Sequence, residues 1–298
     1  MPPAVNYPAT KFLLTLEGKP AGFLSSISGG EPFAKISEVL LATGVTNKRV
    51  AELGYEPITF DVDLPLEKPV YDWLNTFLDN SQQLTSGFIA ILDNSMIERR
   101  RLEWDEALIT RVTFPAVDAA SKDRGQLQCV IQPTRTRRVE SSGARVNATP
   151  TRSASLVSNF RFALAGLEAP AAQVSRIEPL VVRQPVATVD GRPKAGTLEI
   201  PAVKFLVAAN SAGPLFAWFD DFVMKGHNAA NDERNGSLLF LGPQLKDVLL
   251  GVLLKNLGIV RVSELRDVTG GSSIERVRAE LYCEQMQLSP ATPAAPPG

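Results

Sequence analysis

The chain has 298 residues, and 31 lysines and arginines against 32 aspartates and glutamates give it a formal net charge of −1. Apolar residues make up 44% of the chain, which excludes a disordered protein, and the balanced charge argues against an obligate nucleic-acid binder. The longest uncharged apolar run near the C-terminus, 248–254, is far shorter than the roughly 20 residues of a membrane-spanning helix. The N-terminus lacks a signal-peptide pattern. We therefore expect a globular protein that is made in the cytoplasm and does not insert into a membrane.

Short strands of alternating polar and apolar residues dominate the chain, as at 12–16, 58–64 and 126–131. Runs with helical spacing are few, and 22 prolines and 21 glycines punctuate the rest. The glycine pairs at 29–30 and 270–271 lack the lysine of a phosphate loop, and two cysteines with one histidine are too few for a zinc cage. The sequence therefore predicts a mainly β protein with no catalytic, cofactor-binding or metal site.

One helix occurs twice, at 69–80 and at 214–225. In both copies apolar residues recur at i, i+3, i+4, i+7 and i+8, and a proline stands in the first turn. Trp73 of the first copy maps onto Trp218 of the second by a shift of 145 residues, as do the other residues of the stripe. Two copies in one register indicate a duplicated module. The stripe favours core packing of both tryptophans over an exposed aromatic platform for a ligand.

Further matches extend the repeat over both halves of the chain. Three pairs of segments agree, namely 12–18 with 160–166, 109–113 with 259–263, and 127–129 with 281–283. The third pair predicts that Cys129 and Cys283 are equivalent core residues, each in the last strand of its module, and not partners in a disulfide. The expected order along the chain is module 1 at 1–138, a polar linker at 139–155, module 2 at 156–288 and a frayed tail at 289–298.

An excursion broken by glycine and proline interrupts each module, at 41–57 and at 185–196. The first excursion is partly apolar, with Leu41, Val45, Val50 and Leu53. The second is polar, and Asp190-Gly191 predicts a two-residue hairpin turn within it. In a lone chain such arms would expose backbone and apolar groups, which favours contacts with a neighbouring molecule.

Charged residues form two basic groups. Glu98 and Arg99–Arg101 lie on an expected strand whose alternate residues face opposite sides, so this run is either solvated or directed to a channel or an acidic neighbour. The second group spans the expected linker and consists of Arg135, Arg137, Arg138, Arg145 and Arg152, with Glu140 as its acid. It is either solvated or in contact with DNA or an adjacent ring. His227 and the Asp220-Asp221 pair are interpreted as surface residues and not as parts of a catalytic or metal site.

The order of these elements resembles that of tail-tube proteins of contractile phages and related injection systems. In module 1 the resemblance covers 11–138, through the opening strand with Gly18, the excursion ending at Gly54, the strand 58–64, the Trp73 helix and the closing run 112–123. In module 2 it covers the strand from Gly196 and the Trp218 helix. The closing run of module 2 departs from the pattern, because the segment from Ser263 has no counterpart of Pro115.

The resemblance implies two tandem tube modules, each a small β-barrel or sandwich with one flanking helix. Modules of this family join sheet edges into six-module rings that stack into a hollow tube, so three chains would complete one ring and the arms would reach the next. The implied partners are further copies of the chain, sheath and baseplate proteins, and DNA or protein cargo in the lumen. The implied location is a virion tail or a phage-tail-like particle, and no cofactor or active site is implied.

Four classes of function follow from these observations. The first is a structural tube subunit, and the second is a baseplate hub or tube initiator of the same machine, which shares every sequence feature with the first. The third is a tandem β-sandwich binding protein, for instance for carbohydrate. The fourth is an enzyme of unrecognised type, which the missing His, Cys and carboxylate constellations disfavour. We expect a structural role and no enzymatic activity.

Overall fold

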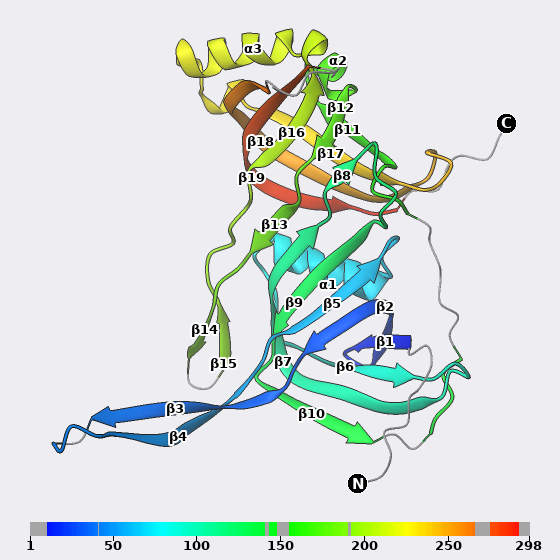
Figure 1. The fold of residues 1–298 in the computed structure, drawn as a ribbon. Helices are drawn as coiled ribbons and strands as arrows, with labels where there is room; N and C mark the ends of the chain where they lie inside the picture. The colour runs from blue at the N-terminus through cyan, green and yellow to red at the C-terminus, as the bar shows by residue number, and fades with distance from the viewer. Residues whose placement is uncertain are drawn as a thin grey trace.

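Two tandem β-barrels and one long projecting hairpin make up the chain, as Figure 1 shows. The computed structural model describes residues 11–40, 42–140, 143–147, 155–189, 192–265 and 275–291. Strands predominate in both barrels and helices are few, which confirms the predicted mainly β fold. None of the helices in this described part of the chain has the length and apolar character needed to traverse a bilayer.

Six strands close the first barrel. In spatial order they are β7 (Glu98–Phe114), β6 (Thr85–Leu92), β1 (Lys11–Leu16), β2 (Lys19–Gly29), β5 (Ile58–Asp63) and β9 (Gln126–Gln132), and β9 pairs back with β7. Alternate residues point inward, as in β5, where Ile58, Phe60 and Val62 are buried. A further strand, β10 (Arg135–Glu140), pairs with the N-terminal half of β7 outside this closed path.

The second barrel has the same strand order but is not fully closed. Its strands, in the corresponding spatial order, are β18 (Val248–Leu265), β17 (Arg234–Leu241), β11 (Phe160–Leu164), β12 (Val174–Ile177), β16 (Val203–Ala208) and β19 (Arg276–Ser289). The short helix α2 (Glu168–Ala171) separates β11 from β12, whereas the equivalent strands β1 and β2 pair directly. The second barrel is therefore open along this one seam.

The duplicated helix is present in both barrels. Helix α1 (Lys68–Leu78) has its proline in the first turn and buries Val70, Trp73, Leu74, Phe77 and Leu78. Helix α3 (Gly213–Phe219) follows the 3₁₀ turn η1 (Ala209–Ser211) and continues as the π-helical turn η2 (Asp220–Met224), and the 3₁₀ turn η3 (Ala230–Asp232) leads on to β17. Trp218 in α3 is buried like Trp73 in α1. The predicted helices and the core role of both tryptophans are confirmed.

The two cysteines are not equivalent, so that part of the predicted repeat is wrong. Val112 lies opposite Cys129, and Val262, which matches Val112 in the repeat, lies opposite Ala279. Cys129 therefore corresponds to Ala279 and not to Cys283. Only Cys283 lies in a last strand, since β10 follows the strand of Cys129. A short Leu-x-Cys match fits any inward-facing strand, which explains the error. Both cysteines are free and buried.

Two short strands cross from one barrel to the other. Strand β13 (Leu180–Arg183) pairs with the C-terminal part of β7, and strand β8 (Val117–Asp118) pairs with β12. One continuous cluster of buried apolar residues runs through both barrels. The barrels are therefore joined by backbone pairing in both directions as well as by side-chain packing.

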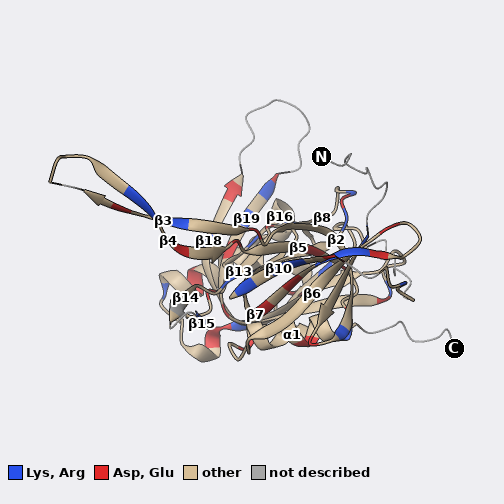
Figure 2. Ribbon diagram, turned by 90° about the horizontal axis from the view of Figure 1, so that it is seen from below, with Lys and Arg blue, Asp and Glu red and all other residues tan. Residues whose placement is uncertain are grey.

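A long hairpin leaves the first barrel and projects into solvent (Figures 1 and 2). It consists of β3 (Pro32–Leu40) and β4 (Thr46–Tyr55), and we call residues 32–55 the arm. The arm begins nine residues before the predicted excursion at 41–57, because residues 32–40 form its first strand and contain no glycine that would mark a break. Position 41 itself lies outside the described residues.

The excursion of the second module also forms a hairpin. It contains β14 (Val186–Val189) and β15 (Arg192–Ala195), which pair with each other in antiparallel register. The predicted turn residues 190–191 lie outside the described residues.

Candidate assembly surfaces

The arm carries an exposed apolar surface. Seven large apolar side chains on it are between 42% and 75% exposed: Phe33, Ile36, Val39, Leu40, Val45, Val50 and Leu53. Two ion pairs cross the hairpin, Lys35 with Glu52 at 2.9 Å and Lys48 with Glu38 at 2.7 Å. A two-stranded hairpin without further support is marginally stable in water. The arm is therefore a surface that a partner would stabilise.

The root of the arm is held firmly to the barrel. Gly29 and Gly30 have φ angles of 83° and 80°, and a Cβ atom on Gly29 would lie 2.0 Å from the carbonyl oxygen of Pro57, so only glycine fits there. The hydroxyl of Thr136 on β10 donates to the carbonyl of Gly30 at 2.6 Å. The glycine pair is thus the point where the chain leaves the barrel.

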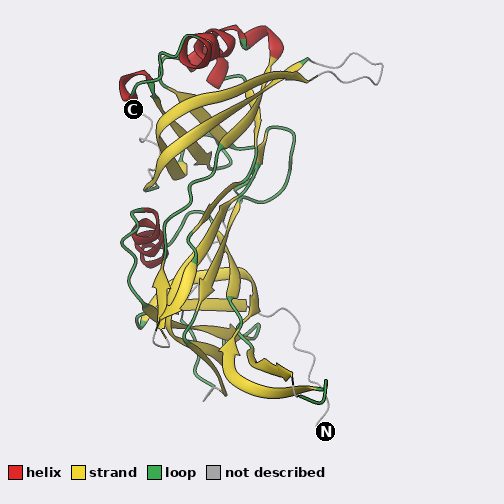
Figure 3. Cartoon of the chain, turned by 90° about the vertical axis from the view of Figure 1, so that its left-hand side faces the viewer, coloured by secondary structure: helices red, strands yellow, loops and turns green. Residues whose placement is uncertain are grey.

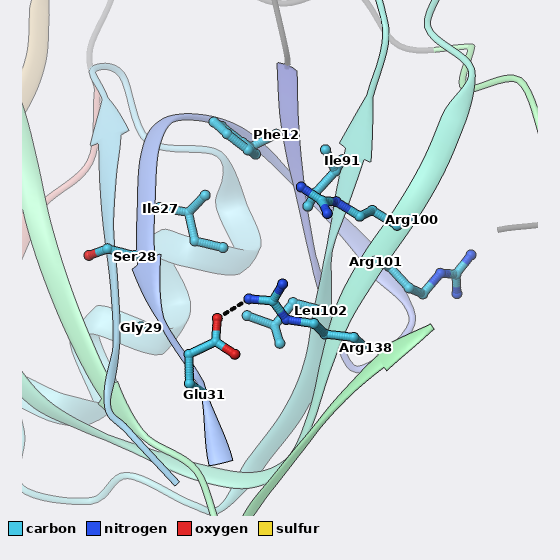
Figure 4. A pocket seen from close by; sticks show the side chains of 10 residues that line it. All are labelled: Phe12, Ile27, Ser28, Gly29, Glu31, Ile91, Arg100, Arg101, Leu102 and Arg138. Carbon is cyan, nitrogen blue, oxygen red and sulfur yellow. Dashed lines mark hydrogen bonds and ion pairs between the residues drawn. The ribbon is translucent and has the colours of Figure 1, made fainter. Parts of the chain in front are cut away.

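A hollow of about 330 Å³ opens beside this root (Figure 4). Its apolar lining comes from Phe12, Ile27, Ile91 and Leu102. Its charged lining comes from Glu31 and three arginines, and Figure 4 shows Glu31 paired with Arg138.

The second barrel fills the equivalent position with apolar side chains. Leu250, which lies opposite Phe240, takes the place of Arg100, which lies opposite Ile91. Leu288, which lies opposite Val252, takes the place of Arg138, which lies opposite Leu102. Leu250 and Leu288 are both buried. The hollow is therefore a feature in which the two modules differ.

Three members of the second basic group precede the expected linker and belong to a strand that the sequence did not predict. Arg135, Arg137 and Arg138 lie on β10, a regular strand. The Nη2 atoms of Arg135 and Arg137 lie 2.8 Å from Asp105 and 2.5 Å from Glu103. The acids that neutralise them come from elements far away in sequence and could not be assigned from the linker alone. Arg145 forms an isolated antiparallel β-bridge with Ile97 through the backbone. Position 152 lies outside the described residues.

The first basic run lies on a strand, as predicted, and its charges are partly neutralised within the chain. Glu98 is buried and accepts bonds of 2.6 and 2.9 Å from Arg101, and this contact raises the pKa of the arginine. Arg101 also lies over the ring of Phe88, 4.2 Å from its centroid. Arg99 pairs with Asp93 at 2.6 Å.

The acidic pair and the histidine after the second helix lie on the surface, as predicted. Lys225 Nζ lies 2.8 Å from Asp220, and the pKa of this lysine is raised by that contact. His227 Nδ1 lies 3.0 Å from Asp221 Oδ1, and both residues are exposed. Among the described residues no three His, Cys, Asp or Glu side chains are grouped so that they could hold a metal ion.

A polar cluster around the buried Gln184 joins the two barrels, and no sequence pattern indicates it. Gln184, which is 1% exposed, donates to Asn80 Oδ1 at 2.5 Å and to the carbonyl of Gly196 at 2.8 Å. Its own carbonyl oxygen accepts from Gln82. Gln82 in turn exchanges bonds of 3.0 and 2.9 Å with the backbone of Ile109 on β7. Neutral amide side chains such as these do not recur at a regular spacing, so the sequence alone cannot reveal which of them will be buried together.

Besides the open seam of the second barrel, the outer edges of β10 and of the far end of β18 are unpaired within the described parts of the chain. Strand β10 pairs only with β7, and residues 258–263 of β18 pair only with β19. Figure 3 shows the β18–β19 hairpin projecting past the second barrel. Val260 in this segment is 46% exposed. An unpaired edge offers N–H and C=O groups to an incoming strand.

No family model matches the chain, and no curated protein matches it. Among solved structures, the chain is similar to the tube-terminating cap of the anti-feeding prophage, at 20% identity and a TM-score of 0.40, over 47% of this chain and 95% of that chain. A chain of the PVC sheath–tube complex, an extracellular contractile injection system, is 18% identical, with a TM-score of 0.40, over 46% and 94%. Hcp1 from Flavobacterium johnsoniae is 14% identical, with a TM-score of 0.27, over 45% and 98%. Each is matched over nearly its whole length by about half of this chain.

Proposed function

We propose that this chain is a structural, non-enzymatic subunit of a phage-tail-like contractile injection machine, in which its barrels form rings and the rings stack into a hollow tube. The arm is the observation that carries the proposal. It exposes seven large apolar side chains on a hairpin whose two strands pair only with each other in the described chain. Such a patch marks an interaction surface and not a feature of a free monomer.

The arm is suited to axial contacts between rings. Each of its strands has nine or ten residues, so at about 3.3 Å per residue it extends about 30 Å from its root. The root of the arm is fixed to the barrel, and the rest of the arm exposes apolar side chains. Both features suit an element that binds a neighbouring ring. The shorter β14–β15 hairpin occupies the corresponding place in the second module and is assigned the same role.

The remaining partners follow from the same proposal. Two barrels per chain make three chains sufficient for a six-barrel ring. Sheath and baseplate proteins would surround and terminate such a tube, and DNA or protein would pass through its lumen. The module boundaries at 138 and 156 are part of the proposal, since strands β8 and β13 exchange partners across them.

Electron microscopy of the purified chain tests the proposal. The full-length chain should form rings or tubes around a central channel, and monodisperse monomers would contradict it. Long tubes support a tube subunit, whereas isolated rings support a terminator, hub or initiator.

A variant tests the arm itself. Replacing residues 34–53 with a short Gly-Ser turn keeps the pair of Phe33 and Gly54 at the root. The barrels should remain folded while stacking is lost, so single rings should replace tubes. Tubes that persist without the arm would assign axial contacts to another surface.

A further inference from the structure

The chain contains one complete joint between barrels. Strand β13, which follows β12 of the second barrel, adds to the outer edge of β7 in the first. In this joint Arg183 lies opposite Arg111, Val182 opposite Val112, and Val181 opposite Thr113. The amide of Gln184 extends the ladder by donating to the carbonyl of Thr110 at 2.9 Å.

The edge of β7 that accepts this strand has a counterpart in the second barrel. Arg111, Val112 and Thr113 correspond to residues 261–263, Arg-Val-Ser, by a shift of 150 residues. Both segments follow a bulge, which lies after Ile109 in β7 and after Ile259 in β18. The two edges are therefore alike in residue type and in backbone geometry.

The strand that adds also has a counterpart, and it is the base of the arm. Ile177 lies opposite Phe205 in the second barrel as Ile27 lies opposite Phe60 in the first. Three residues after each of these isoleucines the chain reaches Leu180 or Gly30. Farther on, Arg183 bridges to Glu199 as Phe33 pairs with Gly54. Residues 181–183 thus correspond to residues 31–33.

These two counterparts do not meet within one chain. In its described residues the edge of β18 over 261–263 is unpaired on its outer side, and Pro32 and Phe33 pair only with β4. We propose that the arm base of a second copy pairs antiparallel with residues 261–263, repeating between chains the joint seen within the chain. The expected opposites are Phe33 with Arg261, Pro32 with Val262, and Glu31 with Ser263. This inference rests on the proposed ring assembly, and it adds which two strands meet between neighbouring chains and in which register.

The chemistry at this joint suits the second copy. Within the chain the register places Arg183 opposite Arg111, and like charges directly opposite are unfavourable. Between chains the same position pairs Arg261 with the aromatic Phe33, which removes the repulsion. A contact of this head-to-tail kind repeats in one direction, and it closes into a ring when the rotation between successive copies divides a full turn, as the proposed assembly requires. Barrels would then alternate between first and second modules around it.

The proposed joint should depend on one backbone hydrogen bond, donated by Val262. Bonding sides alternate along an antiparallel strand, so the Gln184–Thr110 bond directs the N–H of Val112 toward β13. The matching N–H of Val262 points to the open edge. Pro32 has no N–H, so only the bond donated by Val262 to the carbonyl of Pro32 can form at this pair.

Disulfide trapping tests the register in the full-length chain. Glu31 and Ser263 correspond to a non-hydrogen-bonded pair, whose Cβ atoms are close enough for a disulfide, and both native cysteines are buried. Under mild oxidation the double variant Glu31→Cys/Ser263→Cys should give a ladder of covalent oligomers on a non-reducing gel. The control Glu31→Cys/Arg261→Cys is displaced by two residues and should remain largely monomeric.

The outcomes separate this inference from the proposed function. Rings without the ladder, or equal ladders from both variants, would overturn the joint while leaving ring assembly in place. A wild-type chain that forms no rings would overturn both. Val262→Pro should abolish rings with unchanged circular dichroism, because its N–H lies outside the β18–β19 ladder, whereas Val262→Thr should retain them. Rings formed by a folded Val262→Pro variant would also count against the joint.

Discussion

Trp73 and Trp218 occupy the same position in the two barrels, and each is buried with its indole Nε1 lacking a hydrogen-bond partner among the described residues. They are 7% and 6% exposed. Trp218 additionally lies edge-on to Phe222 at 6.0 Å and below the guanidinium of Arg234 at 5.1 Å. The duplicated stripe thus uses tryptophan for its volume, since the polar atom of the ring makes no bond in either copy.

Replacement of either tryptophan by phenylalanine should therefore be tolerated. Trp73→Phe should lower the free energy of unfolding by less than about 1.5 kcal/mol, because most of the apolar volume remains. Trp73→Ala should lower it by about 3–5 kcal/mol, since a cavity is left. Urea unfolding followed by circular dichroism measures both.

Trp104 supplies the matched control. It is also buried, but its Nε1 donates to the carbonyl of Thr85 at 3.1 Å. Trp104→Phe loses that bond and should cost about 1 kcal/mol more than Trp73→Phe. Equal losses from the two phenylalanine variants would contradict the assignment of Trp73 as a purely apolar residue.

The parts of the fold that the sequence predicted are those in which side-chain periodicity reports burial. The helix stripes around Trp73 and Trp218 were found because burial on one face imposes a spacing of 3.6 residues. The start of the arm is not predicted because the apolar residues of β3 suggest a barrel strand, and only its pairing with β4 alone makes it part of an arm. Local pattern cannot distinguish these cases, since pairing is a property of distant residues.

The candidate surfaces were predicted less well, for a related reason. Arg137 is one of a run of charges in the sequence, and only the pairing of β10 with β7 brings it to Glu103. Gln184 gave no signal at all, although it bonds to groups from both modules. Register between distant strands decides both outcomes, and a single sequence carries little information about it.

A charge on the arm should block stacking without harming the fold. Val50 is 75% exposed, so Val50→Lys should change the unfolding free energy by no more than about 0.5 kcal/mol. Burial of that lysine against a neighbouring ring would be unfavourable, so tubes should be replaced by rings or free chains in sedimentation. Val50→Thr, which keeps the β-branched shape, should still assemble. Normal tubes from the lysine variant would show that this face of the arm stays in solvent.

Removal of Gln184 should loosen the contact between the barrels. Gln184→Ala removes three side-chain hydrogen bonds, to Asn80, Gln82 and the carbonyl of Gly196, each worth about 1 kcal/mol, so we expect a loss of about 2–3 kcal/mol in unfolding free energy. Gln83→Ala, at an exposed position nearby, should cost less than about 0.5 kcal/mol. A loss at Gln184 no larger than at Gln83 would mean that the cluster does not hold the barrels together.

The buried thiols should make stability fall in alkaline solution. Burial in the core raises the pKa of Cys129 from 9.0 to about 12, with a smaller contribution from the Asp61 carboxylate, and burial raises that of Cys283 to about 11. Below pH 9 the thiol is protonated in both the folded and the unfolded chain, so the full stability is present. Above pH 9 the unfolded chain releases the proton while the folded chain retains it, and stability falls as pH rises toward these values.

The free energy of unfolding should therefore decline above pH 9 by about 1.4 kcal/mol per pH unit for each thiol. Cys129→Ala removes one of these groups, so its stability deficit relative to the wild type should be constant below pH 9 and should shrink between pH 9 and pH 11. Both thiols should also resist alkylation at pH 8 until the chain is unfolded, because thiolate is the reactive form. A deficit that stays constant up to pH 11, or rapid alkylation of the native chain, would show that Cys129 is reached by solvent in the folded barrel.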